Sequence, residues 1–371
     1  MKAIAVFPNN KTADLINHET PKVVAPTDVK VRILDVGICG TDREICTFEY
    51  GTPPAGSDYL VIGHESLGEV VEVGPSVTRV KVGDLVVPMV RRPCPHAECI
   101  ACRAGRQDFC YTGDFTERGI SGRHGFMTEL VVDHEQYMNV VPRALREVAI
   151  LVEPLTIAEK ALKQIFQVQM RLPWAAPVEP GRMARNSHRA VVLGAGPVGL
   201  LGAMTLRVAD FDTFVYSREP APNAKSQLVE AIGAHYVSST TDSIDQLAAR
   251  VGNIDVVYEA TGASSLSFEV MKVLGTNGVF VFTGVPGRKA PIQVDTDLIM
   301  RDAVLKNQVI FGTVNAGRET FEDAIRDLGI FMQHWPAAVR GLITGRFPIE
   351  ASRDLLFGQP TGIKNVIAVS S

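Results

Sequence analysis

The sequence predicts an α/β protein with two domains, a β-rich one first and a doubly wound parallel sheet after it. The chain has 371 residues, more than the roughly 250–300 at which a single core stops growing. About the first 140 residues are short β-type runs separated by glycine and proline. From Arg189 onward, apolar runs alternate with helical segments, which is typical of a parallel sheet with helical crossovers. The composition, 46% hydrophobic and 21% charged, is that of an ordinary globular protein.

The β-rich part is expected to contain strands at residues 2–7, 29–36, 69–73, 84–90 and 129–132. Residues 145–166 then follow a helical period. The apolar positions that carry this period are Leu155, Ala158, Ala161, Leu162 and Ile165. Residues 171–188 contain prolines and arginines, and we interpret them as a segment that crosses between the domains.

The parallel sheet is expected from strands at residues 190–193, 213–217, 235–238, 255–259, 278–283 and 309–312. Helices are expected between these strands: the first ends near Ala209, and the others span residues 224–232, 243–251 and 265–274. From about Asn315 there remain one amphipathic helix at 319–332 and a short tail, too little for a separate domain. We therefore expect one domain at residues 1–188, with 315–371 packed back onto it, and a second at 189–314.

Charge and hydropathy exclude several classes of partner. The net charge is −4 and the pI about 6.1, so nucleic acid and anionic membranes are not expected as partners. The first eight residues are too short and too soon interrupted by proline for a secretion signal. The longest uncharged run, between Arg189 and Arg207, has 17 residues and four glycines, fewer than the roughly 20 that span a bilayer. The expected location is the cytoplasm.

A glycine motif lies within that uncharged run, directly after an apolar strand and at the start of a helix. It reads G-x-G-x-x-G, with Gly194, Gly196 and Gly199 at its fixed positions. The first glycine permits a tight turn, the second lets the backbone approach a pyrophosphate, and the third allows close packing of helix on strand. The motif predicts a Rossmann dinucleotide site that includes Pro197 and Val198 at the helix N-terminus.

The end of the second strand indicates which dinucleotide is bound. NAD sites place an acid there to hold the ribose hydroxyls, whereas an arginine suits the 2′-phosphate of NADP. The strand ends at Ser217 and Arg218, with Glu219 directly after them. A hydroxyl and a guanidinium favour NADP, and Glu219 leaves NAD possible.

Four of the six cysteines lie within 17 residues, which in a reducing compartment favours metal ligands over disulfides. They are Cys94, Cys99, Cys102 and Cys110. Four such ligands close a tetrahedral shell, so a structural zinc is expected. The fourth ligand is either Cys94 or His96. We prefer Cys94, because the loop at residues 95–98 can bulge out.

A second metal set is scattered along the chain. Cys39, His64 and Glu153 supply a thiolate, an imidazole and a carboxylate, which are a valid set for an open zinc site. Taken singly, each has a more common explanation: a buried small residue, a core histidine and a helix-face carboxylate.

Together these motifs give the chain a family resemblance. The segment around Cys39, the Gly63-His64-Glu65 triplet, the cysteine cluster and the glycine motif occur in the order found in zinc-dependent medium-chain alcohol dehydrogenases. The chain resembles these proteins over nearly its whole length. The closer resemblance is to archaeal-type glucose 1-dehydrogenases, through residues 39–44, 90–92, 105–110, 117–120, 125–127, 153–155 and 312–315.

The resemblance implies a GroES-like catalytic domain with a catalytic zinc held by Cys39, His64 and Glu153. Glu65 would be an exchanging ligand. Asp42 would accept the second ring proton of His64, and Thr41 would hydrogen-bond the substrate hydroxyl and carry its proton away.

The resemblance also implies the substrate and cofactor. An aldose would lose a hydride from its anomeric carbon to NAD(P)+ and become a lactone. Its hydroxyls would be bound by Glu117 and Asn315, together with Thr41 and Glu153 at the metal. Asn315 would also lie near the nicotinamide, and Ala260, Thr261 and Gly262 would line the cofactor ribose. The protein would be a homo-oligomer, a dimer or a tetramer.

Two departures from the family and two alternatives remain open. The first cysteine of the structural lobe, Cys94, is displaced from the family's position. Many alcohol dehydrogenases carry a histidine as proton outlet where this chain has Glu44, so the outlet is not defined. The alternatives are a polyol or secondary-alcohol dehydrogenase with the same zinc, and a non-catalytic NADPH-binding protein. Metal content separates the last from the enzymes, because a catalyst needs two zinc ions per chain and the binding protein only one.

Overall fold

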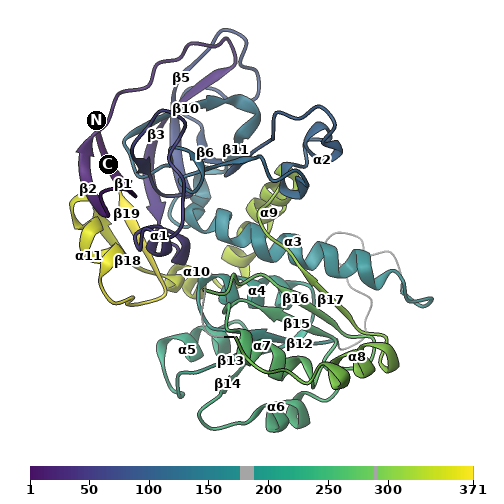
Figure 1. Cartoon of the computed structure of the whole chain (residues 1–371). Helices are drawn as coiled ribbons and strands as arrows, with labels where there is room; N and C mark the ends of the chain where they lie inside the picture. The colour runs from purple at the N-terminus through teal and green to yellow at the C-terminus, as the bar shows by residue number, and fades with distance from the viewer. Residues whose placement is uncertain (176–187, 288–290, 371) are drawn as a thin grey trace. The chain divides into compact units, whose positions relative to one another are not determined.

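The computed structural model describes residues 1–175, 188–287 and 291–370, and these form two compact units (Figure 1). The first contains Met1–Thr156, Asn315–Gly329 and Leu342–Ser371; the second contains Ile157–Val314 and Ile330–Gly341. The first segment of the first unit thus ends at Thr156, earlier than the expected domain boundary at residue 188. The reason is helix α3 (Val152–Gln169), whose later residues bond within the second unit, as Gln169 does to the carbonyl of Asn277.

A seven-stranded sheet forms the centre of the first unit. Its order is β11-β6-β5-β3-β19-β18, with β10 also paired to β3. The strands are β3 (Asp28–Gly37), β5 (Glu65–Val73), β6 (Leu85–Pro88), β10 (Leu130–His134), β11 (Met138–Val141), β18 (Ile343–Pro348) and β19 (Lys364–Ala368). Strand β19 pairs antiparallel with β3, with Val366 opposite Gly37. The end of the chain is therefore built into the sheet that carries the residues around Cys39.

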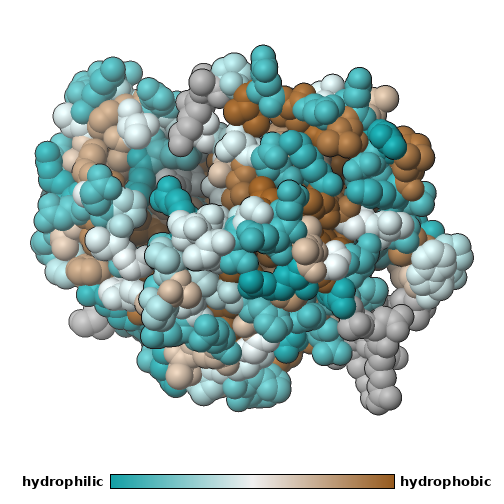
Figure 2. Space-filling view, turned by 90° about the horizontal axis from the view of Figure 1, so that it is seen from below, coloured by the Kyte–Doolittle hydropathy of each residue, from teal (hydrophilic) through white to brown (hydrophobic). Residues whose placement is uncertain are grey.

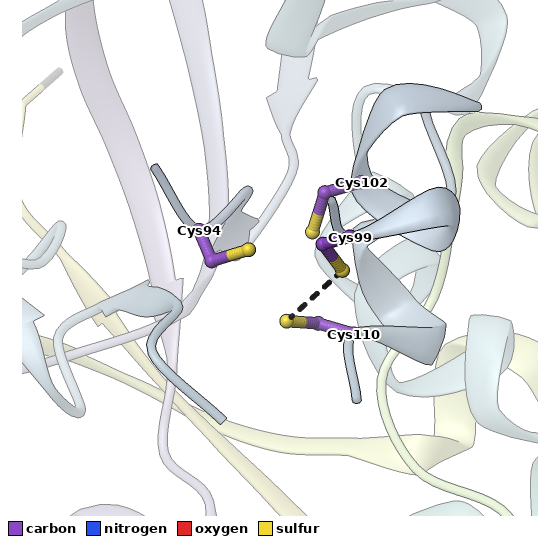
Figure 3. A group of neighbouring side chains, drawn as sticks. All are labelled: Cys94, Cys99, Cys102 and Cys110. Atoms are coloured by element: carbon purple, nitrogen blue, oxygen red, sulfur yellow. Dashed lines mark hydrogen bonds between the residues drawn. The ribbon is translucent and has the colours of Figure 1, made fainter. Parts of the chain in front are cut away.

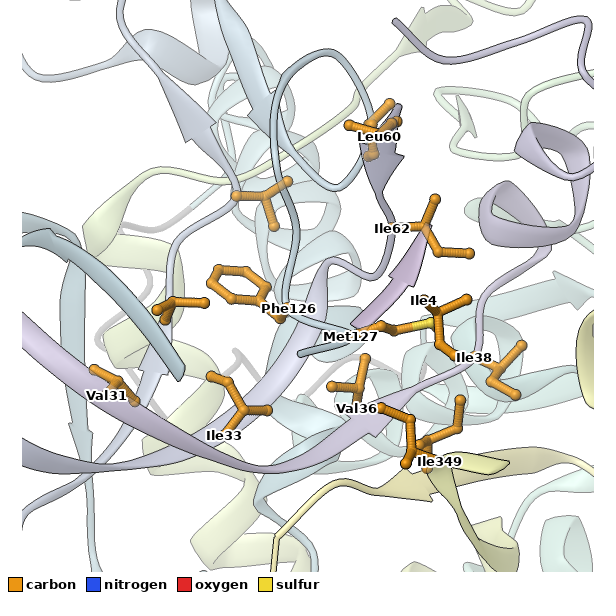
Figure 4. Packing of buried hydrophobic residues seen from close by; sticks show 14 of the residues in the cluster. Ile4, Val31, Ile33, Val36, Ile38, Leu60, Ile62, Phe126, Met127 and Ile349 are labelled. Carbon is orange, nitrogen blue, oxygen red and sulfur yellow. The ribbon is translucent and has the colours of Figure 1, made fainter. Parts of the chain in front are cut away.

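Two three-stranded sheets complete the β-structure of this unit. One consists of β1 (Lys2–Phe7), β2 (Thr12–Asn17) and β4 (Leu60–Val61); the other of β7 (Arg91–Arg92), β8 (Thr116–Arg118) and β9 (Gly122–Arg123). Short helices are α1 (Gly40–Ile45), α2 (Ile100–Arg103) and α11 (Ser352–Phe357). Apolar residues from several of these elements pack into one core, and Phe126 and Ile33 in it are completely buried (Figure 4). Burial of such side chains contributes about 1.5–3 kcal/mol each.

The second unit is built on a six-stranded parallel sheet of order β14-β13-β12-β15-β16-β17. The strands are β12 (Arg189–Leu193), β13 (Asp212–Ser217), β14 (His235–Ser238), β15 (Val256–Glu259), β16 (Val279–Phe282) and β17 (Val309–Gly312). The helices are α4 (Pro197–Val208), α5 (Ala224–Ala231), α6 (Ile244–Val251), α7 (Ser264–Met271) and α8 (Thr296–Leu305), with α10 (Pro336–Leu342) from the later segment. In chain order this is the 3-2-1-4-5-6 arrangement of the doubly wound dinucleotide fold, so the predicted fold class is confirmed.

The structure differs from the sequence predictions mainly at element ends and in the tail. The helix predicted at 145–166 begins at Val152, because residues 143–151 form two 3₁₀ turns first. The helix predicted at 319–332 is α9 (Arg318–His334). The elements that were not predicted include strands β2, β11, β18 and β19, the short strands β4, β7, β8 and β9, and helices α1, α2, α8, α10 and α11. Among the described helices, none combines the length and apolar character needed to cross a membrane. Most of the predicted crossing segment, residues 176–187, lies outside the described residues.

Candidate active site

Strand pairing brings three of the predicted metal-site residues together in the first unit. Cys39 follows β3 and is the N-cap of α1, while Glu65 opens β5 directly after His64. Gly37 and Glu65 are register partners in the β3–β5 pair. The ligand atoms of Cys39, His64 and Glu65 all lie within 4.8 Å of one another. A Cβ on Gly37 would lie 2.1 Å from Oε2 of Glu65, so glycine is needed there.

Asp42 orients the imidazole of His64. Its Oδ2 accepts a hydrogen bond of 2.8 Å from the Cys39 backbone N–H, and its Oδ1 lies 3.3 Å from Nδ1 of His64. Asp42 is fully buried and His64 nearly so, and within the described chain these two atoms face no other polar partner. Burial lowers the pKa of His64, but Asp42 outweighs it, and the net pKa is well above the ordinary value. With Nδ1 facing Asp42, Nε2 remains for a metal.

Lys364, which the sequence analysis did not single out, holds the carboxylate of Glu65. Its Nζ donates to Oε1 at 2.8 Å and to Oε2 at 2.6 Å, and also to the carbonyl of Ile38 at 3.2 Å. Both side chains are 2% exposed. The only feature of the sequence that could have pointed to Lys364 is its place as a lysine at the start of the apolar run of β19. The pair leaves Glu65 within the metal-site group but neutralised by a buried cation.

Glu153 and Thr41 lie beside this group. Glu153 is the second residue of α3 and is not in the cluster of ligand atoms within 4.8 Å. Burial raises its pKa to about 7; His64 acts in the opposite sense, and the nearby Glu65 adds to the rise. The Cys39 Sγ lies 3.9 Å from the hydroxyl of Thr41. All these predicted residues therefore lie in one region of the first unit.

The cysteine cluster forms a second donor set (Figure 3). The sulfurs of Cys94, Cys99, Cys102 and Cys110 lie within 4.8 Å of one another, and all four thiols are free. His96 instead places Nε2 at 2.8 Å from Oδ2 of Asp114. Burial opposes ionisation of Cys110, yet its Thr112 contact and backbone N–H groups lower the pKa to about 6. Four converging thiols fit a closed tetrahedral metal shell, and Cys94 rather than His96 completes the set.

Glu117 and Asn315, the predicted sugar-binding residues, are in direct contact. Asn315 Nδ2 donates to Oε1 of Glu117 at 2.8 Å. Asn315 is held in the left-handed region at φ 58°, where asparagine is tolerated, and its own Oδ1 accepts the N–H of Ala316.

Arg91, which the sequence analysis did not assign a role, clamps the same carboxylate. It is the cross-strand neighbour of Glu117, and its Nε and Nη2 both lie 3.0 Å from Oε1. Its guanidinium stacks on the Phe115 ring at 3.7 Å. The described hydrogen bonds to Glu117 all reach Oε1, so Oε2 remains as the acceptor for a ligand. Tyr50 lies close enough that Glu117 contributes to raising its pKa, after burial.

The glycine motif forms the dinucleotide loop of the second unit. Gly194 has φ 100°, and a Cβ there would lie 2.7 Å from Cγ2 of Thr261. A Cβ on Gly199 would lie 2.0 Å from the carbonyl oxygen of Gly194. A Cβ on Gly196 would meet no described atom within 4 Å, so this backbone is open to an approaching pyrophosphate. The N-terminus of α4 begins at Pro197, and Val198 follows it.

Buried Glu259 fixes the neighbouring loop that was expected to line the ribose. Its Oε1 accepts the N–H of Thr261 at 2.6 Å and that of Gly262 at 2.8 Å, and its Oε2 accepts the N–H of Gly284 at 3.1 Å. Glu259 is completely buried at the end of β15. The sequence analysis missed it, since an acid at a strand end has no distinctive pattern. It ties two loops at the carboxyl edge of the sheet, where doubly wound folds bind dinucleotides.

The comparisons with known proteins agree with this arrangement. The family model for the alcohol dehydrogenase GroES-like domain matches residues 25–143, and the model for the glucose dehydrogenase C-terminus matches residues 146–369. Glucose 1-dehydrogenase of Methanocella arvoryzae is 37% identical and that of Thermoproteus tenax 34%, each covering all of both chains. The glucose dehydrogenase of Haloferax mediterranei, solved with NADP, Zn and gluconolactone, superposes with a TM-score of 0.87 at 32% identity over all of both chains. The chain therefore belongs to the glucose dehydrogenase family of zinc-type alcohol dehydrogenases.

Proposed function

We propose that the chain is a zinc-dependent oxidoreductase that transfers a hydride from the anomeric carbon of an aldose, glucose in the first instance, to NADP+. The product is the aldonolactone. The observation that carries this proposal is the placement, in one unit, of the Cys39–His64–Glu65 group and of the hydrogen-bonded pair of buried Glu117 and half-buried Asn315. A metal-site donor set alone suits any alcohol; the second pair adds acceptors for sugar hydroxyls. The named relatives support the substrate and the cofactor.

Cys39, His64 and Glu153 would hold the catalytic zinc, with Glu65 as the exchanging ligand. A bound zinc supplies Lewis acidity, which stabilises negative charge on the substrate oxygen near neutral pH. Thr41, beside Cys39, would accept the hydroxyl proton and pass it on. Asp42, through its contact with Nδ1 of His64, would leave Nε2 free to bind the metal.

Glu117 would bind the sugar through Oε2 while Arg91 and Asn315 occupy Oε1. A carboxylate fixed in this way needs little reorganisation to accept a hydrogen bond from a sugar hydroxyl, and such a buried polar contact discriminates against substrates that lack the hydroxyl. Cys94, Cys99, Cys102 and Cys110 would hold the structural zinc.

NADP would be bound by the second unit. The loop from Gly194 to Gly199, with Pro197 and Val198, would hold the pyrophosphate, and Thr261 and Gly262 would line the ribose. Ser217 and Arg218 would face the 2′-phosphate. The dinucleotide supplies the hydride acceptor.

We also propose that the protein is a homo-oligomer and that two copies meet at α8 and β17. Strand β17 is an edge of the parallel sheet and leaves Ile310 36% exposed. Helix α8, just before it, has no buried residue and exposes Met300, Val304 and Leu305. Apolar residues also gather on part of the face in Figure 2. Two identical edge strands can pair antiparallel about a two-fold axis, which closes both edges. Val304→Glu should lower the mass measured by light scattering to that of a smaller species; an unchanged mass would exclude this surface.

The proposed function is tested with a panel of aldoses, polyols and simple alcohols, each with NADP+ and NAD+, together with zinc analysis. We expect the highest kcat/KM with an aldose and NADP+, and two zinc ions per chain. A preference for polyols at two zinc ions would replace the aldose assignment, and one zinc with no turnover would leave a dinucleotide-binding protein.

A further inference from the structure

Three charged residues gather after β13, and two of them form an ion pair. Glu219 Oε1 pairs with Nζ of Lys225, which lies on α5. The backbone carbonyl of Glu219 accepts a hydrogen bond of 2.7 Å from the hydroxyl of Tyr236. Both the carboxylate and the backbone of Glu219 are thus fixed. Arg218 is exposed, and in the described part of the chain no acid pairs with it.

Lys225 occupies a place that is unusual for a lysine. It is in the first turn of α5, where the cap Asn223 accepts its N–H at 2.8 Å and the N–H of Ser226 at 2.9 Å. A cation near a helix N-terminus is disfavoured by the helix dipole. The Lys225 side chain is nevertheless only 22% exposed, against 49% for Glu219. The Lys225 side chain is therefore largely covered by protein, and the negative charge of Glu219 offsets the unfavourable interaction of its cation with the helix dipole.

The ion pair changes what the strand end can recognise. A free carboxylate at this place accepts the ribose hydroxyls of NAD and repels the 2′-phosphate of NADP. With its charge neutralised and its Oε1 engaged, Glu219 loses most of both effects, and Arg218 is left as the charge that faces the phosphate. We propose that Lys225 is a specificity residue: by holding Glu219, it makes this strand end selective for NADP. The inference rests on the proposed dinucleotide site and deepens it.

The test is a double-mutant cycle on dinucleotide affinity, read from nicotinamide fluorescence on the full chain without sugar. Lys225→Met frees Glu219, so we expect NADPH to bind about 3- to 10-fold more weakly, the size of effect of one partly solvated charge. NADH should bind equally well or better. Glu219→Gln should change NADPH affinity less than about twofold, because that charge is already neutralised. In the double variant NADPH affinity should return to within about twofold of the wild type.

Lys272→Met is the matched control. Lys272 forms a similar pair with Glu269 on α7, at 2.8 Å and with comparable exposure. It should leave the ratio of NADPH to NADH affinity unchanged.

Two results would overturn the proposal. If NADPH binding remains as weak in the double variant as in Lys225→Met, the lysine acts on the phosphate directly and not through Glu219. If Lys225→Met weakens NADPH and NADH alike, the pair is only structural. Failure of the proposed function is seen separately: a chain that binds neither dinucleotide refutes the dinucleotide site, whereas one that binds NADPH without oxidising sugars leaves the cycle interpretable.

Discussion

Breaking the buried pair of Lys364 and Glu65 should strongly destabilise the first unit. Lys364→Met keeps the length of the side chain but leaves the Glu65 carboxylate buried without its cation, since both hydrogen bonds to it come from Nζ. Removing one partner of a buried ion pair costs about 3–5 kcal/mol. For a unit of this size, each kcal/mol lowers Tm by about 2–4 °C, so a decrease of about 6–20 °C is expected.

Thermal unfolding at matched zinc content measures this loss, and Lys30→Met provides the comparison. Lys30 on β3 pairs with its cross-strand neighbour Glu72 on β5 at 2.6 Å, but Glu72 is 50% exposed. A solvated pair contributes at most about 1 kcal/mol, so Lys30→Met should lower Tm far less. Adding Glu65→Gln to Lys364→Met should recover much of the loss, because no buried charge is then left unpaired. If Lys364→Met and Lys30→Met have equal effects, burial does not set the strength of the Lys364 pair.

Four further predictions concern the site and the pH dependence. Cys39→Ser should abolish turnover and lower the zinc content while the circular dichroism spectrum stays unchanged; retained activity at the same metal content would reject its ligand role. Cys102→Ser should lower Tm more than it lowers the rate per folded molecule, and an unchanged Tm would contradict a structural zinc. Glu117→Ala should cost about 1–3 kcal/mol in kcat/KM for an aldose and much less for a simple alcohol; equal losses would make Glu117 purely structural. Burial, aided by His18 and Arg118, lowers the pKa of His124 to about 4. The contribution of neutral His124 to the free energy of unfolding is therefore complete above about pH 6.5 and is lost as the pH falls towards 4. His124→Gln should flatten this part of the Tm–pH curve, and an unaltered curve would exclude His124 as its cause.

The fold was largely predictable because its signals are local. Most strands and helices of the parallel sheet carry their own pattern of apolar residues, and the glycine motif marks where the first crossover begins. Helix α8 was not predicted: none of its residues is fully buried, and Ile299 packs only partly buried against the core. Strand β19 escaped it for another reason: it lies between β18 and β3, and β3 comes more than three hundred residues earlier in the chain, so no local pattern identifies this short run as a strand.

The candidate ligand residues were predictable from motifs and the family resemblance, whereas their partners were not. Cys39, His64 and Glu65 stand in recognisable short patterns, and β3–β5 pairing brings them together. Lys364 reaches Glu65 from 299 positions away. Nothing in the sequence around a lone lysine indicates which acid it will meet.

A common electrostatic rule connects three of these sites. Glu65, Glu117 and Glu219 each face a cation to which the sequence analysis gave no role: Lys364, Arg91 and Lys225. Burying an unpaired carboxylate is costly, so the two buried ones need a compensating charge if the unit is to fold before any metal or sugar binds.

That rule changes how substitutions at these glutamates should be interpreted. Replacing the acid alone leaves the cation without its partner and also removes a ligand contact. The measured loss of stability or of kcat/KM therefore combines both effects. The contribution of the contact itself is obtained only by replacing acid and cation together and taking the difference. For Glu117 this means that Glu117→Ala gives an upper bound on its contribution to sugar binding, and the pair of variants at Glu117 and Arg91 gives the value.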